Sequence, residues 1–271
     1  MLVRVMLLFI VIVCLIEMGQ TYYLSVKHKK EQADLKNTFL TEENAAKQKE
    51  PDGREEGEEV LPENPPLEVT ADDLMQEPEI MEKYKSLYAE NKDLIGWLSI
   101  PGTAIDYPVM QSEDNEYYLH HNFYGEEDKY GCLFVKDFAD INTPSTNFVI
   151  YGHNMKDGSM FGDLDEYRKE SFFLEHPLIY FNTLYEERTY EIMAVFLSQI
   201  YESDDDVFKY YEFYQADTEN EFLSFYENII DLSLYETGVT AEFGDTFLML
   251  STCAYHVEDG RLVVVAKRVV D

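Results

Sequence analysis

Apolar and polar residues are distributed in three different ways along the chain, and each pattern predicts a different kind of segment. Val5 to Ile16 form an unbroken apolar run. Residues 31–70 are polar and charged, without a helical or strand period. From Ala71 onward, short apolar stretches alternate with turn residues. The pattern therefore predicts, in order, a membrane anchor over 1–25, a polar stalk or linker over 26–70, and one folded domain over 71–271.

The apolar run is long enough for a membrane anchor when it is extended to Leu24. About 20 apolar residues cross the roughly 30 Å of hydrocarbon, and Arg4 and Glu17 lie near the ends of the run. A cleaved signal peptide would require small residues at a cleavage site, and a lipoprotein would require a small residue before Cys14, where Val13 stands. We therefore expect an uncleaved anchor. The lysines after it do not fix its orientation, because long domains translocate largely regardless of flanking charge.

The folded domain is expected to begin with helices and to continue as a β-barrel. Residues 71–91 carry apolar positions at helical spacing, and Pro78 divides them into a short helix and a longer one. Eight segments rich in β-branched and aromatic residues follow, at 93–100, 104–110, 131–136, 147–152, 178–183, 188–200, 245–252 and 261–270. A further helix is expected over 216–232. The strands predict a mainly β fold, an eight-stranded closed or nearly closed antiparallel barrel.

Composition and charge narrow the classes of function. The 271 residues include 54 Asp and Glu against 21 Lys and Arg, a formal charge of −33. Because a surface this acidic repels a phosphate backbone, we expect no nucleic-acid binding. The hydrophobic share of 45% excludes a wholly disordered chain. The three cysteines are too few, and odd in number, for a disulfide framework.

Cys253 is the candidate nucleophile of the folded domain. It ends the strand segment TFLMLST, where a rigid strand would present its side chain next to a loop. A cysteine at this position also fits a small hydrophobe packed in the core. A reactive thiolate would require a base or a cation that lowers the thiol pKa from about 8.5.

His153 is the leading candidate for the base. It follows the strand segment NFVIYG, and Gly152 before it would let the backbone turn sharply. The alternative for His153 is a histidine in an exposed turn. His256, only three residues after Cys253, is a lesser rival for the same role.

Arg261 is the candidate cation. It opens the last strand segment, RLVVVAKRV. If the last two strands are neighbours, Arg261 lies beside Cys253, where a guanidinium stabilises a thiolate or the oxyanion of a tetrahedral intermediate. The alternative is a surface ion pair with Glu258 or Asp259.

Three motifs together resemble the sortase family, and within it class B. They are YGHN at 151–154, LSTC at 250–253 and the arginine that opens RLVVVAK at 261–267. The similarity extends over 95–111 (IGWLSIPGTAIDYPVMQ), 117–123 (YYLHHNF) and 151–164 (YGHNMKDGSMFGDL), and covers the chain from about Ala71 onward. The segment GCLFVK departs from the family pattern at Cys132 and Lys136 and leaves the three motifs unaffected.

The resemblance implies a cysteine transpeptidase anchored in the membrane of a Gram-positive cell by a single span, with its catalytic domain outside. Cys253 would attack the threonine carbonyl of a C-terminal sorting motif in a secreted protein and form a thioester. His153 would transfer protons, and Arg261 would hold the oxyanion. An amine of the peptidoglycan stem peptide or its lipid-linked precursor would resolve the thioester. No cofactor and no metal are implied. Four residues next to these three are candidates for contact with the substrate: Tyr151, Asn154, Ser251 and Thr252. The alternative is that they are ordinary strand and turn residues.

Three alternatives remain at this point. A papain-type hydrolase would carry its cysteine at the start of a helix with its histidine downstream, whereas His153 here precedes Cys253. A non-catalytic surface module would keep Cys253 in the core. A pilin-polymerising sortase would use a lysine amine of another subunit, and such enzymes often carry a lid loop and a second, C-terminal span that this sequence does not show. The sequence identifies neither the sorting motif nor the accepting amine.

Overall fold

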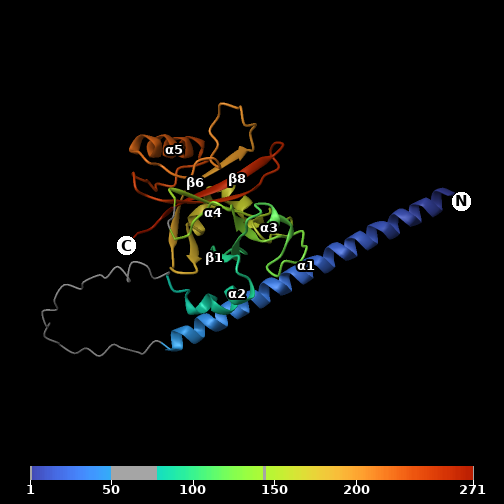
Figure 1. Ribbon diagram of the computed structural model, residues 1–271. Helices are drawn as coiled ribbons and strands as arrows, with labels where there is room; N and C mark the ends of the chain where they lie inside the picture. The colour runs from blue at the N-terminus through green and yellow to red at the C-terminus, as the bar shows by residue number, and fades with distance from the viewer. Residues whose placement is uncertain (1, 50–77, 143–144, 271) are drawn as a thin grey trace.

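A computed structural model describes residues 2–49, 78–142 and 145–270 of the chain (Figure 1). Its centre is a closed barrel with the strand order β1-β2-β3-β4-β7-β8-β6-β5. The strands are β1 (Leu94–Ser99), β2 (Asp106–Gln111), β3 (Leu133–Val135), β4 (Asn147–Tyr151), β5 (Leu178–Thr183), β6 (Thr189–Gln199), β7 (Phe247–Cys253) and β8 (Gly260–Arg268). Each of the eight expected strands is present, and the closure of the barrel is confirmed.

Two of the strand pairs in this barrel are parallel, which corrects the expectation of an antiparallel barrel. β2 pairs in parallel with β3, and β4 pairs in parallel with β7. The other pairs of the described barrel are antiparallel. Parallel strands need a long crossover connection, and between β4 and β7 the chain forms β5, β6 and three helices. As a consequence, β4 and β7 end at the same edge of the barrel.

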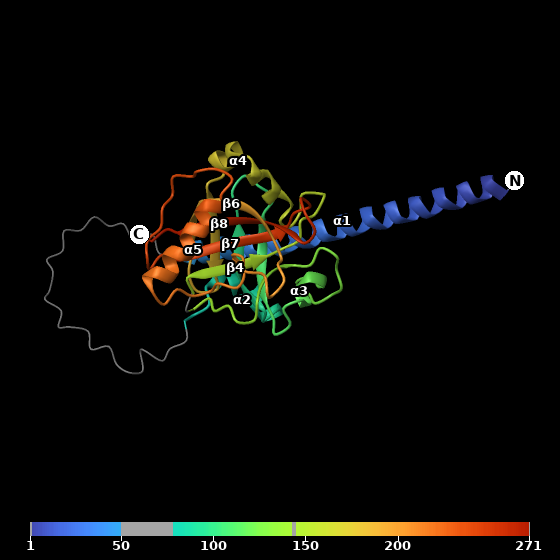
Figure 2. The same cartoon turned by 90° about the horizontal axis from the view of Figure 1, so that it is seen from above.

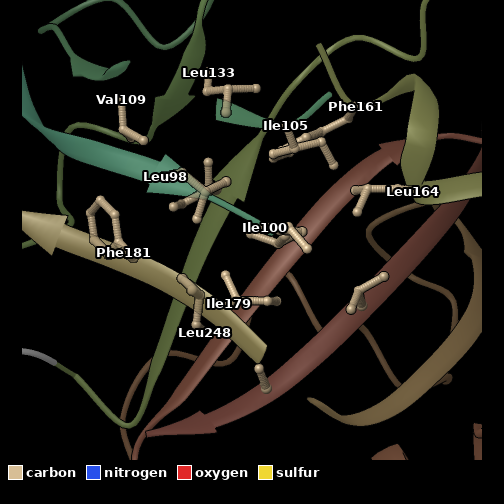
Figure 3. Close-up of a cluster of buried hydrophobic side chains, with 14 of the residues drawn as sticks. Leu98, Ile100, Ile105, Val109, Leu133, Phe161, Leu164, Ile179, Phe181 and Leu248 are labelled. Atoms are coloured by element: carbon tan, nitrogen blue, oxygen red, sulfur yellow. The ribbon is translucent and has the colours of Figure 1, made fainter. Parts of the chain in front are cut away.

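Side chains alternate along β7 between the interior of the barrel and its outer face. Leu248 and Leu250 point inward and belong to the main core, part of which is shown in Figure 3. Phe247 and Met249 belong to a second apolar cluster outside the barrel, beneath helix α5 (Glu219–Leu232). β4 and β8 divide their side chains between the two clusters in the same way. The outer face of these three strands is therefore a second packing surface.

Helix α5 confirms the helix expected between the sixth and seventh strands. A capping box starts it: the Thr218 side chain accepts a hydrogen bond from the Glu221 backbone, and the Glu221 carboxylate accepts one from the Thr218 backbone. These bonds satisfy amide groups that a helix N-terminus leaves open. The buried face of α5 consists of Phe222, Phe225 and Ile229.

Short helices precede β1 and connect some of the strands. They are η2 (Glu82–Tyr84), α2 (Lys85–Glu90), α3 (Tyr117–His120), η3 (Gly162–Arg168) and α4 (Glu170–Glu175). The longer of the two helices expected before the barrel is present as η2 and α2. The shorter one, placed before Pro78, lies outside the described residues.

The N-terminal helix α1 (Leu2–Lys49) is much longer than the expected anchor. Its N-terminal half projects from the domain with exposed apolar side chains, and its C-terminal half lies along the barrel (Figures 1 and 2). By length and composition it contains one segment that qualifies as a membrane span. Residues 26–49, which the sequence assigned to a polar linker, are helical, and the rest of that linker lies outside the described residues.

Buried side chains explain why the polar part of α1 folds onto the domain. The Phe39 ring stacks on Trp97 with ring centroids 4.8 Å apart, and Leu35 is 1% exposed in the same cluster. Glu31 accepts a hydrogen bond of 2.9 Å from the Asn122 amide. One residue in every three or four along this segment faces the barrel, a helical period. The many charged residues between them hide this period in the sequence.

Candidate active site

His153, Cys253 and Arg261 come from three neighbouring strands of the barrel. In the parallel pair β4–β7, Tyr151 lies opposite Ser251, so His153, two residues later, reaches the level of Cys253. In the antiparallel pair β7–β8, Cys253 lies directly opposite Arg261. Adjacent strands are about 4.8 Å apart. The register therefore brings these three positions, distant in the sequence, to one edge of the barrel, and all three residues are partly exposed.

Cys253 points to the outer face of the barrel. Residues two apart in a strand share a face, and two residues earlier the Ser251 hydroxyl lies 2.7 Å from the Tyr210 hydroxyl. Tyr210 belongs to the apolar cluster outside the barrel. The sulfur is thus directed away from the core, in contrast to the alternative in which Cys253 is a packed core residue.

Arg261 shares the outer face with Cys253. Two residues after it along β8, Val263 belongs to the outer cluster. The Arg261 Nη1 donates hydrogen bonds to the backbone carbonyls of Asp259 (3.1 Å) and Gly260 (3.0 Å). The contact with Asp259 thus runs through its backbone and not through its carboxylate, which differs from the surface ion pair considered above. The loop thus holds Nη1 in place. Because neutral carbonyls do not cancel the guanidinium charge, that charge can still act on a negative group beside Cys253.

The orientation of the His153 ring is set by a backbone group that the sequence did not indicate. The imidazole Nε2 lies 2.8 Å from the carbonyl oxygen of Leu119, in α3. Because a carbonyl oxygen only accepts hydrogen bonds, Nε2 carries the proton, and Nδ1 is the nitrogen that can take up a second one. A base held by a third group is the arrangement that nucleophilic catalysis needs. A backbone carbonyl has no signature in a sequence, so its role was not predictable.

Side-chain hydrogen bonds join the ends of β4 and β7 next to these residues. The Thr252 hydroxyl donates to the Gly152 carbonyl at 2.7 Å, and the Asn154 amide donates to the Cys253 carbonyl at 2.9 Å. The Gly152 amide donates to the Ser251 carbonyl at 3.3 Å. Thr252 and Asn154 thus hold the two strand ends together. Their expected contact with substrate, like that of Tyr151 and Ser251, stays a prediction.

Gly152 is required for space and not for a turn. Its φ does not lie in the left-handed region. A Cβ on this residue would lie 2.4 Å from Leu133 Cδ2 and 2.8 Å from Phe161 Cδ2, closer than real contacts allow. The sharp turn expected from the sequence is therefore not the reason for a glycine before His153.

Two tyrosines lie on the outer side of the site: Tyr210 is buried and Tyr151 is partly buried. Burial raises the pKa of Tyr210 to about 12, although the Ser251 hydrogen bond and the Arg261 charge lower it. Burial likewise raises the pKa of Tyr151, whose hydroxyl is buried without a hydrogen-bond partner in the described residues. Both phenols are neutral near pH 7. The Arg261 charge thus faces neutral hydroxyls on this side and is not cancelled by them.

The three side chains are of the types that acyl transfer through a thioester uses. A thiol, an imidazole and a guanidinium lie at the ends of three neighbouring strands, and such groups can form and cleave a thioester. Within the described residues, no group of three His, Cys, Asp or Glu is placed to hold a metal ion.

Comparisons with known proteins find relatives over most of the described barrel. A family model described as a sortase domain matches residues 98–269. The chain is 38% identical over 198 residues to sortase B of Listeria monocytogenes, a match that covers 70% of this chain and 76% of that protein. It is 29% identical over 189 residues to sortase B of Staphylococcus aureus, with 68% and 74% covered.

Solved structures show the same fold. The crystal structure of sortase B from Bacillus anthracis in complex with AAEK2 matches with a TM-score of 0.69 and 31% identity, over 90% of this chain and 97% of that one. A Staphylococcus aureus sortase B–substrate complex matches with a TM-score of 0.63 and 27% identity, over 70% and 86%.

Proposed function

Since the chain belongs to the sortase family and is a class B cysteine transpeptidase of cell-wall sorting, we propose that it cleaves the C-terminal sorting motif of secreted proteins after a threonine and joins the new acyl group to a cell-wall peptide amine. The observation that carries this proposal is the register of β4, β7 and β8, in which Cys253 lies opposite Arg261 and level with His153.

In the first half of the reaction, the Cys253 sulfur attacks the threonine carbonyl carbon. His153 takes the thiol proton on Nδ1, the nitrogen that the Leu119 contact leaves basic. The carbon–nitrogen bond after the threonine then breaks, and the same proton goes to the leaving amine. The product is a thioester between the substrate and Cys253.

Arg261 stabilises the negative charge that develops on the threonine oxygen. It stands opposite Cys253 on the same outer face, and its Nη1 is already held by two backbone carbonyls. A fixed donor needs little reorganisation when the oxyanion forms, which is the basis of electrostatic transition-state stabilisation.

In the second half, an amine of the peptidoglycan stem peptide or of its lipid-linked precursor attacks the thioester. His153 removes a proton from the incoming amine and returns it to the departing sulfur, so that the enzyme is regenerated. A partly exposed face is required here, because the second substrate must reach a carbon that is already bonded to Cys253.

We place the catalytic domain outside the cell, with residues 1–25 as a single-span anchor and the N-terminus inside. The apolar helix of suitable length supports the anchor, and the reaction with cell-wall amines supports the orientation. The catalytic domain keeps the proposed limits 71–271, and the part of α1 from His28 to Phe39 is packed against it.

Intact-mass spectrometry of the full chain with candidate sorting peptides tests the function. The wild-type protein should gain the mass of the acyl fragment, as a thioester that hydroxylamine releases. Cys253→Ala should gain no mass and lose turnover by more than about a thousandfold. Cys14→Ser, which changes an exposed cysteine outside the barrel, is the matched control and should still form the adduct. An adduct that persists in Cys253→Ala would contradict the assigned nucleophile.

A further inference from the structure

We propose that the turn after β4 and the loop between β7 and β8 rest on the outer leaflet of the cell membrane, so that the catalytic edge opens at the bilayer surface. The membrane-facing surface consists of Met155 and Lys156 after β4, Tyr255 and Val257 between β7 and β8, and the adjacent Lys129 from the segment between α3 and β3. The inference rests on the proposed anchoring by α1. It adds the position of the catalytic domain relative to the bilayer.

Helix α1 presents one continuous stripe of residues to the domain. The residues at positions 14, 18, 21, 25, 28, 32, 35 and 39 follow each other at alternating intervals of four and three, which keeps them on one helix face. The C-terminal part of the stripe, with His28, Leu35 and Phe39, is buried against the barrel. The N-terminal part, from Cys14 to Ser25, lines a cavity of about 900 Å³. Its opposite wall includes Asn154, Met155, Lys156, Asp157 and Tyr255.

The helical side of this cavity belongs to the proposed membrane span. At 1.5 Å per residue, a span of about 30 Å that ends near Leu24 has Cys14 near its centre and Tyr22 close to its outer end. Tyr255 lines the cavity together with both residues. The loop after Cys253 therefore reaches the level of the span and does not stand clear of the membrane.

A polar contact supports the same placement. The Ser25 hydroxyl, at the end of the span, donates a hydrogen bond of 2.9 Å to the Asp157 carboxylate. Glu17 and Thr21, two of the polar residues before it, also line the cavity and so face the domain. A polar side chain in a span is stabilised when it faces protein or water and not lipid.

The exposed side chains of the membrane-facing surface have the chemistry of an interface. Tyr255 is 78% exposed and Val257 45% exposed, although both lie in a tight loop beside the catalytic edge. Tyrosine is enriched where a bilayer meets water, because its ring is apolar and its hydroxyl is polar. Tyr22 and Tyr23 of α1 are also strongly exposed. The three tyrosines would form one aromatic belt at the membrane surface.

The distribution of lysines also favours a membrane as the partner of this surface. The chain has a net charge of −33, yet exposed lysines gather where the headgroups would lie: Lys27, Lys29 and Lys30 on α1, and Lys129 and Lys156 on the domain. Anionic headgroups attract such a cluster. Lys27 and Lys29 also contact carboxylates of Glu126 and Asp157, which fixes the domain against α1 at this height. Glu258 and Asp259 lie on the returning half of the loop, toward Arg261.

The placement has a direct consequence for the second substrate. Asn154 lines the cavity and also holds the Cys253 carbonyl, so the space beside α1 adjoins the nucleophile. An amine carried on a lipid would reach the thioester without leaving the membrane surface. The proposal thus favours a lipid-linked acceptor over polymerised wall.

Fluorescence quenching by brominated phospholipids tests the proposal on the full chain in vesicles. Tyr255→Trp should lose about half of the added tryptophan signal, because an interfacial side chain lies about 5–10 Å into the headgroup and acyl boundary. The native Trp97 is 3% exposed and packs against Phe39, and its signal is subtracted with the unchanged protein. Leu232→Trp, at the end of α5 on the side of the barrel away from the projecting half of α1 (Figures 1 and 2), is the matched control and should not be quenched.

A third variant, Tyr22→Trp, separates the proposal from the anchoring on which it rests. Quenching of Tyr22→Trp together with Tyr255→Trp supports both the anchoring by α1 and the membrane-facing surface. If Tyr22→Trp is quenched and Tyr255→Trp behaves like Leu232→Trp, the anchor stands and the membrane-facing surface is refuted. If neither is quenched, the anchoring fails and the proposal falls with it.

Discussion

Cys253 is accessible because of its place in the alternation of β7. Its neighbours Thr252 and Ala254 are buried, whereas Cys253 is partly exposed on the outer face. A shift of one residue in the register would exchange these environments and bury the sulfur. The hydrogen bonds from Thr252 and Asn154 to the facing strand end fix this register where the sheet stops. Reactivity at this position thus depends on side chains that need not touch the substrate.

The Arg261 guanidinium is expected to act through its shape as well as its charge. Arg261→Lys should keep the fold, because Arg261 is partly exposed and its Nη1 bonds are to its own loop. Turnover should fall by about a hundredfold or more, since an ammonium cannot reproduce two fixed donor directions. Steady-state kinetics with a soluble sorting peptide measures the loss. Turnover near the wild-type value would remove Arg261 from the proposed mechanism.

Thr252 allows a matched pair of substitutions at the strand ends. Thr252→Val keeps the shape of the side chain but leaves the Gly152 carbonyl without the hydroxyl that now donates to it. An unsatisfied buried acceptor costs about 1–3 kcal/mol, so chemical denaturation should show a loss of that size together with reduced turnover. Thr252→Ser keeps the hydroxyl donor and should recover most of the stability and most of the turnover. Equal behaviour of the two variants would show that the hydrogen bond is unimportant.

The site residues differ in how far the sequence reveals them. Cys253 and Arg261 are predictable as strand-end residues, because a strand pair is a local pattern and the two are joined by a short loop. The Leu119 carbonyl that holds His153 is not predictable, since only the folded chain brings α3 to that ring. The role of Gly152 was misjudged for the same reason: the atoms that exclude a Cβ belong to distant Leu133 and Phe161.

At the scale of elements, local pattern predicts the strands and distant pairing decides their neighbours. Each of the eight strands follows from β-branched and aromatic stretches between turns. The parallel pairs β2–β3 and β4–β7 do not, because pairing across a crossover depends on the whole barrel. Helix α1 was underestimated for a related reason. The side chains that stabilise its second half do so only against the barrel, and the charged residues between them read as a linker.

The docked part of α1 contains a histidine in an unusual position. His28 is 1% exposed and stacks on Tyr130 with ring centroids 4.2 Å apart. Neither ring nitrogen has a hydrogen-bond partner in the described residues. Burial lowers the pKa of His28, and the nearby charges of Asp128 and Asp157, which raise it, do not compensate. The docked helix therefore favours a neutral His28.

Docking of α1 should consequently weaken in mild acid. The undocked histidine has a pKa of about 6.5, so the contribution of neutral His28 is complete above that pH. It is lost as the pH falls below 6.5 toward the lowered pKa of the docked state, at up to about 1.4 kcal/mol per pH unit. Hydrogen exchange of residues 28–39 measured from pH 7 to pH 5, corrected for the intrinsic rate, should show faster opening at the acid end.

His28→Phe separates this effect from other titrations. Phenylalanine keeps the stack on Tyr130 and cannot be protonated, so the acid-dependent opening should disappear. His120→Gln, at an exposed histidine, should leave it unchanged. The raised pKa of Glu31 acts in the opposite direction, because it weakens docking as the pH rises above about 4.5. An unchanged pH dependence in His28→Phe would assign the effect to another group.

For the whole molecule, the continuity of α1 joins the proposed anchor to the helix segment that packs on the catalytic domain. The helix runs from the apolar segment into the buried Leu35 and Phe39 without a break. The polar composition of residues 26–70 predicts a solvated stalk that would set the reach from membrane to substrate. In the structure, residues 28–39 of α1 pack against the barrel, and the sequence could not show this because the contacts are tertiary.

Inserting a flexible Gly-Ser segment between Leu24 and Ser25 should separate the two functions of α1. The domain would keep its docked helix and its barrel, so cleavage of a soluble sorting peptide should stay within about twofold of wild type. Transfer to an amine presented on vesicles should fall by about tenfold, because the proposed orientation at the surface is lost. A rigid helical insertion of seven residues, which preserves the face of the helix, is the comparison. Equal transfer by all forms would show that orientation does not matter.

The position of β8 in the barrel determines at which stage of folding Cys253 and Arg261 become neighbours. β8 is the last strand in chain order, yet it lies between β6 and β7, which have no other connection in the sheet. Until β8 pairs with both of these strands, the barrel is open between β6 and β7, and Cys253 has no arginine opposite it. The strand that closes the barrel is therefore also the one that carries Arg261 to its place opposite Cys253.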